Sequence, residues 1–269
     1  AVNNDIGSIG VAPNASLYAV KDNDITINGG NNAILSSAIS GIYWSVKNGM
    51  NVINLSIRFD APSADLEAAV NYAYAHGVVL VASAGNQGKE TGNPGRMIYP
   101  ALYSNTIAIS ATGPDNNLTS FSSHVSEVDL AAPGSAILTS AMGSSYDSIA
   151  GTSIAAPFVS GVAALILSKN PQFTPAQVRE RLESTATDFG ALGRDNYFGY
   201  GLVNARDSVF PPALPVILTI TSPKEGKEWL EGTEQEVRWS VKNVPSGQKL
   251  EKVDIQLVHE QVQTTFTNK

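Results

Sequence analysis

The chain of 269 residues is defined first by what it lacks. It has no cysteine, so disulfides contribute nothing to its stability, and cysteine usage gives no indication of a redox compartment. No run of about 18 apolar residues occurs, so no membrane span is expected. Charged residues make up only 15% and the net charge is −7, which argues against a nucleic acid partner. Apolar residues make up 43%, which is enough for a packed core.

The most informative stretch is residues 151–157, with the sequence GTSIAAP. It places Ser153 where a loop turns into a helix, and the nearly all small or apolar residues at 158–167 predict that this helix is buried. The N-terminus of a helix presents free N–H groups and favours negative charge. An oxyanion formed by attack of the Ser153 hydroxyl on a carbonyl would be stabilised there. The alternative is that Ser153 is an N-cap that only completes the helix end.

Four segments, in this order, resemble the subtilisin-like serine proteases. They are residues 3–13 with the strand that follows at 15–21, NVINLS at 51–56, SAGN at 83–86, and GTSIAAPFVSGVAAL at 151–165. The similarity extends over about residues 1–207. Four motifs in the family's order and spacing are a far more specific signal than any one of them alone.

The resemblance implies a role for each matching residue. Ser153 matches the catalytic serine, and the Asn86 side chain matches the amide that completes the oxyanion hole. Without the family context, Asn86 beside a glycine is simply a turn asparagine. The resemblance implies that a peptide substrate adds as a strand beside residues 56–58, and that residues 83–85 form the wall of the first specificity pocket. The substrate-binding residues implied are Ser56, Ile57, Arg58, Ser83, Ala84 and Gly85.

A base for the serine is missing from the sequence. A serine hydroxyl needs a histidine, oriented by an aspartate, to take its proton. His76 is expected to end a helix, His124 to lie in a surface loop and His259 to lie in the tail, and none matches the family's histidine motif. In the family the histidine and aspartate precede the segment that matches residues 1–13. We therefore expect a truncated protease that has no triad-dependent activity by itself.

The N-terminal loop resembles a calcium loop of the family. Ca²⁺ takes six to eight oxygen ligands, many of them backbone carbonyls. The resemblance implies the Asn4 side chain and the carbonyls of Val2, Ile6 and Ser8 as donors, an incomplete set for a structural calcium ion. The alternative is an ordinary solvated, asparagine-rich turn.

Strand-like and helix-like patterns alternate along the first part of the chain. Strands are expected at 16–20, 52–57, 78–82 and 106–111, and helices at 33–48 capped by Asn32, at 64–76 capped by Ser63, and after Thr174 with Pro175 at the first position. This order predicts an α/β fold, a mainly parallel sheet with helices on both faces, followed by a partial all-β module. In such sheets, sites form at the carboxyl ends of strands, and Asn86 follows one of them.

The composition changes near the proline-rich residues 210–215, which predict a stiff linker. Beyond it, apolar residues alternate with polar ones at 237–241 and 253–257, the pattern of half-buried strands. The tail, with Trp229 and Trp239, resembles the start of an immunoglobulin-like module, although it is shorter than a complete sandwich. Two domains are therefore expected: a subtilisin-like protease domain without its N-terminal part at 1–211, and a partial accessory module at 212–269.

The function implied is serine endopeptidase activity through an acyl-enzyme, with a polypeptide as substrate. The family and the appended module imply a secreted protein that is a monomer, has no nucleic acid or membrane-spanning partner, and associates with a cell wall or surface through the tail. The alternative is a non-catalytic peptide-binding or scaffolding protein with a degenerate protease fold.

Overall fold

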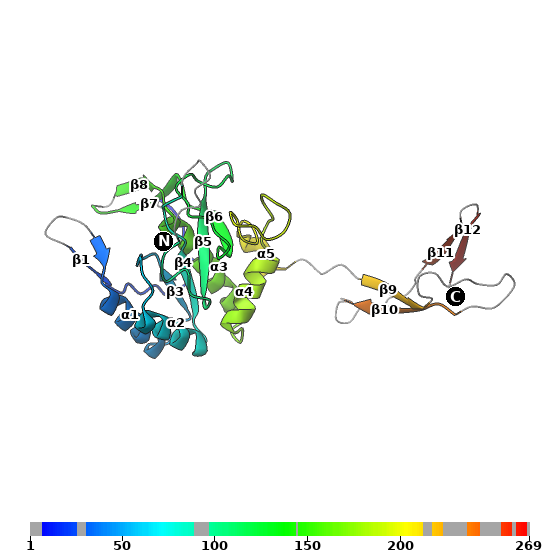
Figure 1. Cartoon of the computed structure of the whole chain (residues 1–269), viewed down its shortest axis with the longest axis horizontal. Coiled ribbons are helices and arrows are strands. Elements are labelled where there is room, and N and C mark those ends of the chain that lie inside the picture. Colours follow the sequence, from blue (N-terminus) through cyan, green and yellow to red (C-terminus); the bar gives the residue numbers. More distant parts are fainter. Residues whose placement is uncertain are drawn as a thin grey trace. The chain divides into compact units, whose positions relative to one another are not determined.

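The computed structural model describes residues 7–25, 31–88, 97–143, 145–211, 217–222, 236–242, 254–259 and 262–267. The chain divides into two compact units, Ala1–Pro211 and Pro212–Lys269. The first unit contains a layered α/β structure (Figure 1). In the second unit two antiparallel hairpins are described, one of β9 (Ile217–Ser222) with β10 (Arg238–Lys242) and one of β11 (Asp254–His259) with β12 (Val262–Thr267).

A parallel sheet forms the centre of the first unit. Its strands are β3 (Val52–Leu55), β4 (Val79–Ser83), β5 (Thr106–Thr112) and β6 (Leu130–Pro133), in the order β3-β4-β5-β6. β4 and β5 are buried along their whole length, as expected for strands covered on both faces. The strands predicted at 52–57, 78–82 and 106–111 are thus confirmed within one or two residues at their ends.

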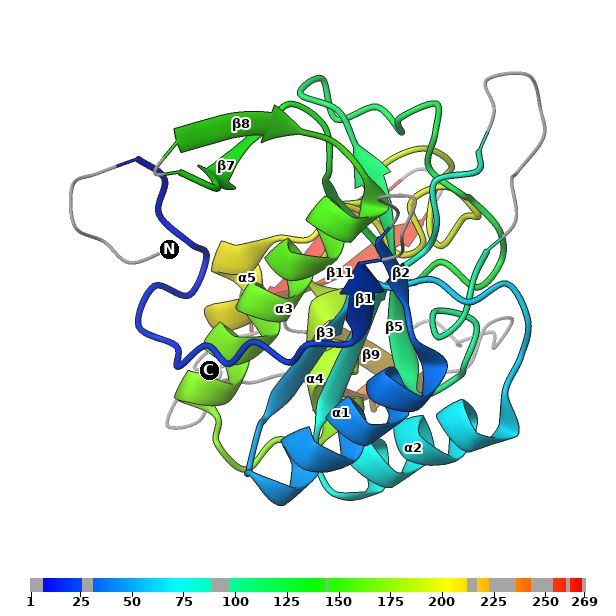
Figure 2. The same cartoon turned by 90° about the vertical axis from the view of Figure 1, so that its left-hand side faces the viewer.

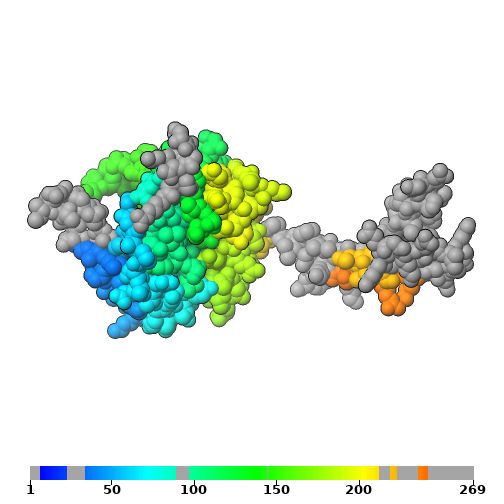
Figure 3. Space-filling view, viewed as in Figure 1, coloured from blue at the N-terminus to red at the C-terminus, as the bar shows by residue number. Residues whose placement is uncertain are grey.

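Helices cover both faces of this sheet, as the sequence predicts. They are α1 (Leu35–Lys47) and α2 (Ala64–Ala75) on one face, α3 (Thr152–Lys169) and α4 (Pro175–Ser184) on the other, and the short α5 (Ala205–Val209) next to α3. Alternation along β4 separates the two cores: Leu80 and Ala82 face α1 and α2, whereas Val79 and Val81 face α3 and α4. In the space-filling view the cyan surface of α2 and the yellow-green surface of α4 flank the central segments (Figure 3).

Two helix starts follow the predicted chemistry. The Ser63 hydroxyl accepts a hydrogen bond from the N–H of Leu66 at the start of α2. At the start of α4, Thr174 and Gln177 form a capping box, with proline at the first helical position.

Two predictions near the N-terminus are wrong. Residues 16–20 form no strand, because no neighbouring strand among the described residues pairs with them. The helix predicted at 33–48 begins at Leu35 rather than after an Asn32 cap. Ala33, its expected first residue, belongs instead to β2 (Asn31–Ala33), and Ile34 is the N-cap residue. β2 pairs with β1 (Asn23–Ile25), and this pairing takes precedence over local helix propensity.

The helix α3 lies at the centre of the second core. Among the described residues it is the one helix long and apolar enough to cross a membrane, with 18 residues and a mean hydropathy of 1.4. It packs instead against β4 and β5, and its side chains at 155, 156, 159, 162, 163 and 166 are buried there. Figure 2 shows the N-terminal segment, in dark blue, running past this helix. Val11 fits against Gly161, where a Cβ would lie only 2.7 Å from it.

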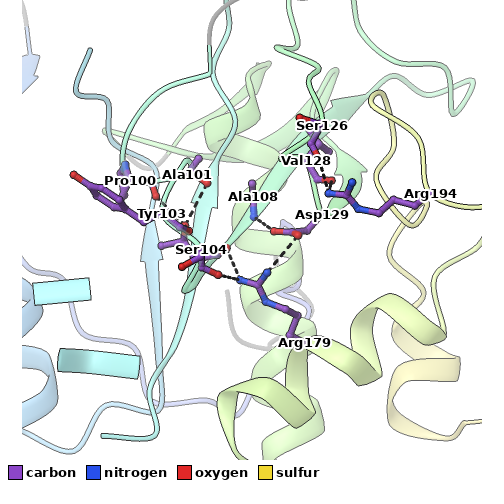
Figure 4. Close-up of polar contacts among 11 residues, drawn as sticks. Pro100, Ala101, Tyr103, Ser104, Ala108, Ser126, Val128, Asp129, Arg179 and Arg194 are labelled. Atoms are coloured by element: carbon purple, nitrogen blue, oxygen red, sulfur yellow. Dashed lines mark hydrogen bonds and ion pairs between the residues drawn. The ribbon is translucent and has the colours of Figure 1, made fainter. Parts of the chain in front are cut away.

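A buried ion pair joins α4 to the sheet (Figure 4). Arg179 lies 3.3 Å from the Asp129 carboxylate and donates to the carbonyl oxygens of Ser104 and Thr106. The other Asp129 oxygen accepts from the N–H of Ala108 at 2.8 Å. Burial raises the pKa of Asp129 above its ordinary value, although Arg179 opposes this shift. The carboxylate therefore depends on its cationic partner.

Replacing Arg179 with alanine is expected to lower the free energy of unfolding by about 3 kcal/mol near neutral pH, because the buried Asp129 carboxylate loses the cation that is hydrogen-bonded to it. The pKa of Asp129 is higher in the folded state than in the unfolded state, and removing Arg179 raises the folded-state pKa further. Stability of the variant should therefore fall as pH rises through the raised pKa, and the loss should be smaller near about pH 5 than near about pH 8. Denaturant unfolding at the two pH values measures both.

The matched control is Arg206→Ala, whose ion pair with Asp207 is exposed on the arginine side. This change should cost less than about 0.5 kcal/mol at either pH. An equal loss in both variants, or a loss for Arg179→Ala that does not change with pH, would contradict the assignment.

Candidate active site

Ser153 lies in the first turn of α3, but it is not the cap of that helix. Gly151 is the N-cap residue, so the N-cap interpretation of Ser153 is wrong. The Ser153 side chain is half-buried, and its hydroxyl has no hydrogen-bond partner among the described residues. The free hydroxyl is thus held at the positive end of a partly buried 18-residue helix.

The neighbouring Thr152 ties this turn to the end of β4. Its backbone N–H and its hydroxyl both donate to Asn86 Oδ1, each at 2.8 Å. The same hydroxyl accepts from the N–H of Gly85 at 3.1 Å. Thr152 is fully buried, whereas Asn86 is exposed. The Asn86 side chain is therefore anchored through its oxygen, which leaves the Nδ2 donor available.

Gly151 allows Asn86 to approach the helix start. Its φ of 152° lies in the region that favours glycine, and a Cβ there would lie 3.3 Å from Asn86 Nδ2. The side-chain nitrogen of Asn86 therefore lies beside Gly151, two residues before Ser153. The structure thus brings Asn86 to the start of the helix that carries Ser153. Asn86 and its partner Thr152 are 66 residues apart in the sequence.

The segment after β3 lies on the other side of the helix start. The Ser56 hydroxyl donates to the carbonyl oxygen of Ser153 at 2.8 Å. Ile57 is half-buried against the core on the α1 and α2 face. Arg58 is exposed and forms an ion pair with Asp60 at 2.9 Å. Of the three residues predicted to bind substrate here, Ser56 thus uses its side chain to contact the helix.

The predicted pocket wall, Ser83, Ala84 and Gly85, is buried at the end of β4. The N–H of Ala84 donates to Ile109, and the carbonyl of Gly85 accepts from Ser123. These backbone bonds hold the wall rigidly beside Asn86, and its role in substrate binding stays a prediction.

The histidines of the first unit are engaged elsewhere. His76 is the C-cap of α2, as predicted, and its Nδ1 lies 2.8 Å from the carbonyl oxygen of Tyr72. His124 is half-buried rather than a simple surface residue: its ring stacks on Tyr197 at 4.7 Å and its Nδ1 lies 3.0 Å from the carbonyl oxygen of Ser122. His259 belongs to β11 in the second unit. Within the described part of the chain, neither His76 nor His124 is hydrogen-bonded to Ser153.

The predicted calcium ligands Val2, Asn4 and Ile6 lie outside the described residues, as does Trp229. Ser8 is described and is half-buried. Within the described part of the chain, no group of three or more His, Cys, Asp or Glu side chains is arranged to hold a metal ion. The predicted loop relies mainly on carbonyl oxygens, so calcium binding there stays a prediction.

The fold and site together define an α/β protein whose site lies at the carboxyl edge of a parallel sheet, where a buried helix begins. The chain belongs to the subtilase family: the sequence model of that family matches residues 1–201.

The relatives are similar over the first unit. Subtilisin E of Bacillus subtilis is 48% identical over 206 residues, which cover 77% of this chain and 52% of that protein. Subtilisin Savinase of Lederbergia lenta is 45% identical over 205 residues, covering 76% of this chain and 72% of that protein. The chain spans 51% of the alkaline protease of Alkalihalobacillus alcalophilus, at 45% identity.

A solved structure confirms the fold. Fervidolysin from Fervidobacterium pennivorans, a keratinolytic enzyme related to subtilisin, matches with a TM-score of 0.66 and 31% identity. The match covers 80% of this chain and 36% of fervidolysin.

Three residues of the site were missed in the sequence. Thr152 is hydrogen-bonded to Asn86. Asn54 donates to Ser56, and Ser160 donates in turn to Asn54. Thr152 could have been found from its place beside Ser153, since a buried hydroxyl there needs a partner. Asn54 and Ser160 are 106 residues apart, and no local pattern signals their contact.

Replacing Thr152 with valine, which removes the hydroxyl and keeps the volume, is expected to lower the free energy of unfolding by about 2 kcal/mol, because the buried N–H of Gly85 loses its acceptor. The NMR signals of the Asn86 side-chain amide should shift in the same variant. Thr152→Ser keeps the hydroxyl and should restore both properties. If valine and serine behave alike, the hydroxyl does not anchor Asn86.

Proposed function

We propose that this chain is part of a secreted serine endopeptidase of the subtilisin kind that cleaves peptide bonds through an acyl-enzyme. The single observation that carries the proposal is the free Ser153 hydroxyl at the start of α3, beside an Asn86 amide whose oxygen is already bound by Thr152. The proposed nucleophile and the two proposed oxyanion donors thus lie at or beside the start of the same helix.

The chemistry follows from these positions. Ser153 Oγ attacks the carbonyl carbon of the scissile bond, and its proton passes to a base. The negative charge on the carbonyl oxygen is stabilised by Asn86 Nδ2 and by the backbone N–H of Ser153, where the helix dipole is also favourable. When this intermediate collapses, the base gives the proton to the leaving nitrogen, the C–N bond breaks and the amine is released, which leaves an ester on Ser153 that water then hydrolyses.

The base and its orienting carboxylate are proposed to come from residues outside this sequence. His76 and His124 each donate from Nδ1 to a nearby main-chain carbonyl oxygen, and His259 belongs to the second unit. The 269-residue chain is therefore proposed to be inactive by itself.

The substrate is a polypeptide, which lies extended along Ser56, Ile57 and Arg58 and beside the wall at residues 83–85. A structural calcium ion near Ser8, with Val2, Asn4 and Ile6 as the other ligands in this chain, belongs to the same proposal. Six to eight oxygens are needed, so further ligands must come from elsewhere. The second unit is proposed to be an accessory module for attachment to a cell wall or surface.

The complete protein should hydrolyse casein, and Ser153→Ala should abolish this activity. Asn86→Ala should lower kcat on the order of a hundredfold, the loss known when this donor is removed from subtilisin itself. The purified 269-residue chain should show no hydrolysis that depends on Ser153, because it lacks the base. Casein hydrolysis is followed by release of acid-soluble peptide.

Two results would count against the proposal. Hydrolysis by the 269-residue chain that is lost in Ser153→Ala would place the base within this sequence. A complete protein that binds peptides but leaves them uncut would favour the alternative of a peptide-binding scaffold.

An apolar patch of Leu17, Tyr18, Val20 and Trp44 supports the view that further residues pack on this unit. The rings of Tyr18 and Trp44 lie 6.4 Å apart, and Val20 fits against Gly41 of α1. Leu17 is 92% exposed. Exposed apolar clusters of this kind are typical of surfaces that are covered by another segment or partner.

The 269-residue chain is therefore expected to self-associate, and Leu17→Glu should reduce this by placing a charge in the patch. The matched control is Leu192→Glu, because Leu192 is 99% exposed but lies outside the patch. Sedimentation velocity over a range of concentrations measures the effect. A sharp, cooperative melt of a monomeric wild-type chain would refute this expectation.

A further inference from the structure

The carbonyl group of Ser153 cannot make the usual hydrogen bond of its helix. In an α-helix this carbonyl accepts from the N–H four residues later. That residue is Pro157, which lies inside α3 and has no N–H. Its ring also crowds the carbonyl four residues earlier and tilts it away from the helix axis. The residue proposed as nucleophile therefore carries an acceptor that α3 cannot satisfy.

Ser56 supplies the missing donor from outside the helix. Its hydroxyl donates to the Ser153 carbonyl oxygen at 2.8 Å, across 97 residues of sequence. The contact is partly buried, so an unsatisfied carbonyl here would carry a cost. The bond attaches the backbone of Ser153 to the segment that directly follows β3, the edge strand of the sheet.

Two further side chains orient the Ser56 hydroxyl. Asn54 Nδ2 donates to Ser56 Oγ at 2.9 Å, which directs the Ser56 proton toward Ser153. Ser160 Oγ lies 3.0 Å from Asn54 Oδ1 and 3.1 Å from the carbonyl oxygen of Ala156, so its one proton serves either acceptor. The donors thus run in one direction, from Ser160 through Asn54 and Ser56 to Ser153.

The spacing of these residues suits the two elements. Asn54 and Ser56 are two apart and project to the same side of an extended chain. Ser153 and Ser160 are seven apart, which is two turns of helix and the same face. The relay therefore fixes α3 against the end of β3 at two points along one helix face.

We infer that Ser56 is a positioning residue for Ser153, which acts by satisfying the carbonyl that Pro157 leaves without an intrahelical donor. Asn54 and Ser160 hold Ser56 in the donating rotamer. The Ser153 N–H and the Ser153 side chain are attached to the same Cα as this carbonyl, so the bond restrains the backbone from which both project. The effect on catalysis rests on the proposed function, whereas the hydrogen bond itself does not.

The kinetic test uses the complete protein. Ser56→Ala should lower kcat on the order of 10- to 100-fold with little change in KM, because small displacements of a reacting group have effects of this size. Ser56→Thr keeps a hydroxyl and should recover most of the rate. The matched control is Ser168→Ala, which removes a hydroxyl that bonds to Leu165 near the far end of α3, and should leave kcat unchanged.

A cycle with Pro157→Ala tests the cause. Alanine at 157 provides the N–H that α3 lacks, so the Ser153 carbonyl no longer depends on Ser56. The loss of kcat caused by Ser56→Ala should therefore be about threefold or more smaller in the Pro157→Ala background. Equal losses in the two backgrounds would show that Ser56 acts in some other way, and the inference would be wrong.

A second readout needs no activity and uses the 269-residue chain. With ¹³C-labelled serine carbonyl carbons, the Ser153 signal should move upfield in Ser56→Ala and return in Ser56→Thr, while Ser168→Ala leaves it in place. An unmoved Ser153 signal in Ser56→Ala overturns the inference. A shifted signal together with a complete protein that cleaves no peptide leaves the positioning contact established and refutes the proposed function instead.

Discussion

Two consecutive residues at the start of α3 are tied to two neighbouring parallel strands, and the geometry of the site depends on this attachment. Thr152 binds Gly85 and Asn86 at the end of β4, and the carbonyl of Ser153 binds Ser56 at the end of β3. Neighbouring strands are about 4.8 Å apart, so the sheet sets the separation of the two anchors. The helix start is thereby fixed in position and in rotation about its axis.

Two residues near the start of α3 are unusual for a helix that carries a site. Its N-cap is a glycine with no side chain to accept a hydrogen bond, and a proline lies inside the helix. Each of these features leaves a backbone group available: the Ser153 N–H at the start of the helix for an anion, and the Ser153 carbonyl for Ser56. Natural sequences depart from local consistency mainly at functional or strained positions. The stability lost locally is compensated by the burial of the rest of α3 against the sheet.

The parts of the fold with strong periodic or capping signals could be predicted from the sequence. The buried strands β4 and β5 and the capped helices α2 and α4 follow the predicted chemistry closely. The start of α1 could not be predicted, because it is decided by the pairing of β1 with β2. Within the site, Ser153 and Asn86 lie in recognisable motifs. Asn54 and Ser160 meet only because α3 crosses β3, and such a contact has no local signature.

The proposed oxyanion donors and the proposed base for Ser153 differ in origin. The two proposed oxyanion donors are Asn86 Nδ2 and the Ser153 N–H. The helix start that carries Ser153 is hydrogen-bonded to residues 85–86 through Thr152 and to Ser56 through the Ser153 carbonyl, all within one unit. Electrostatic stabilisation of a transition state works best when donors are fixed before the charge forms, because they need no reorganisation. These donors are fixed by contacts that involve neither His76 nor His124. Under the proposed function, this unit therefore supplies the oxyanion donors by itself, and the group that takes the proton from Ser153 is the part proposed to come from elsewhere.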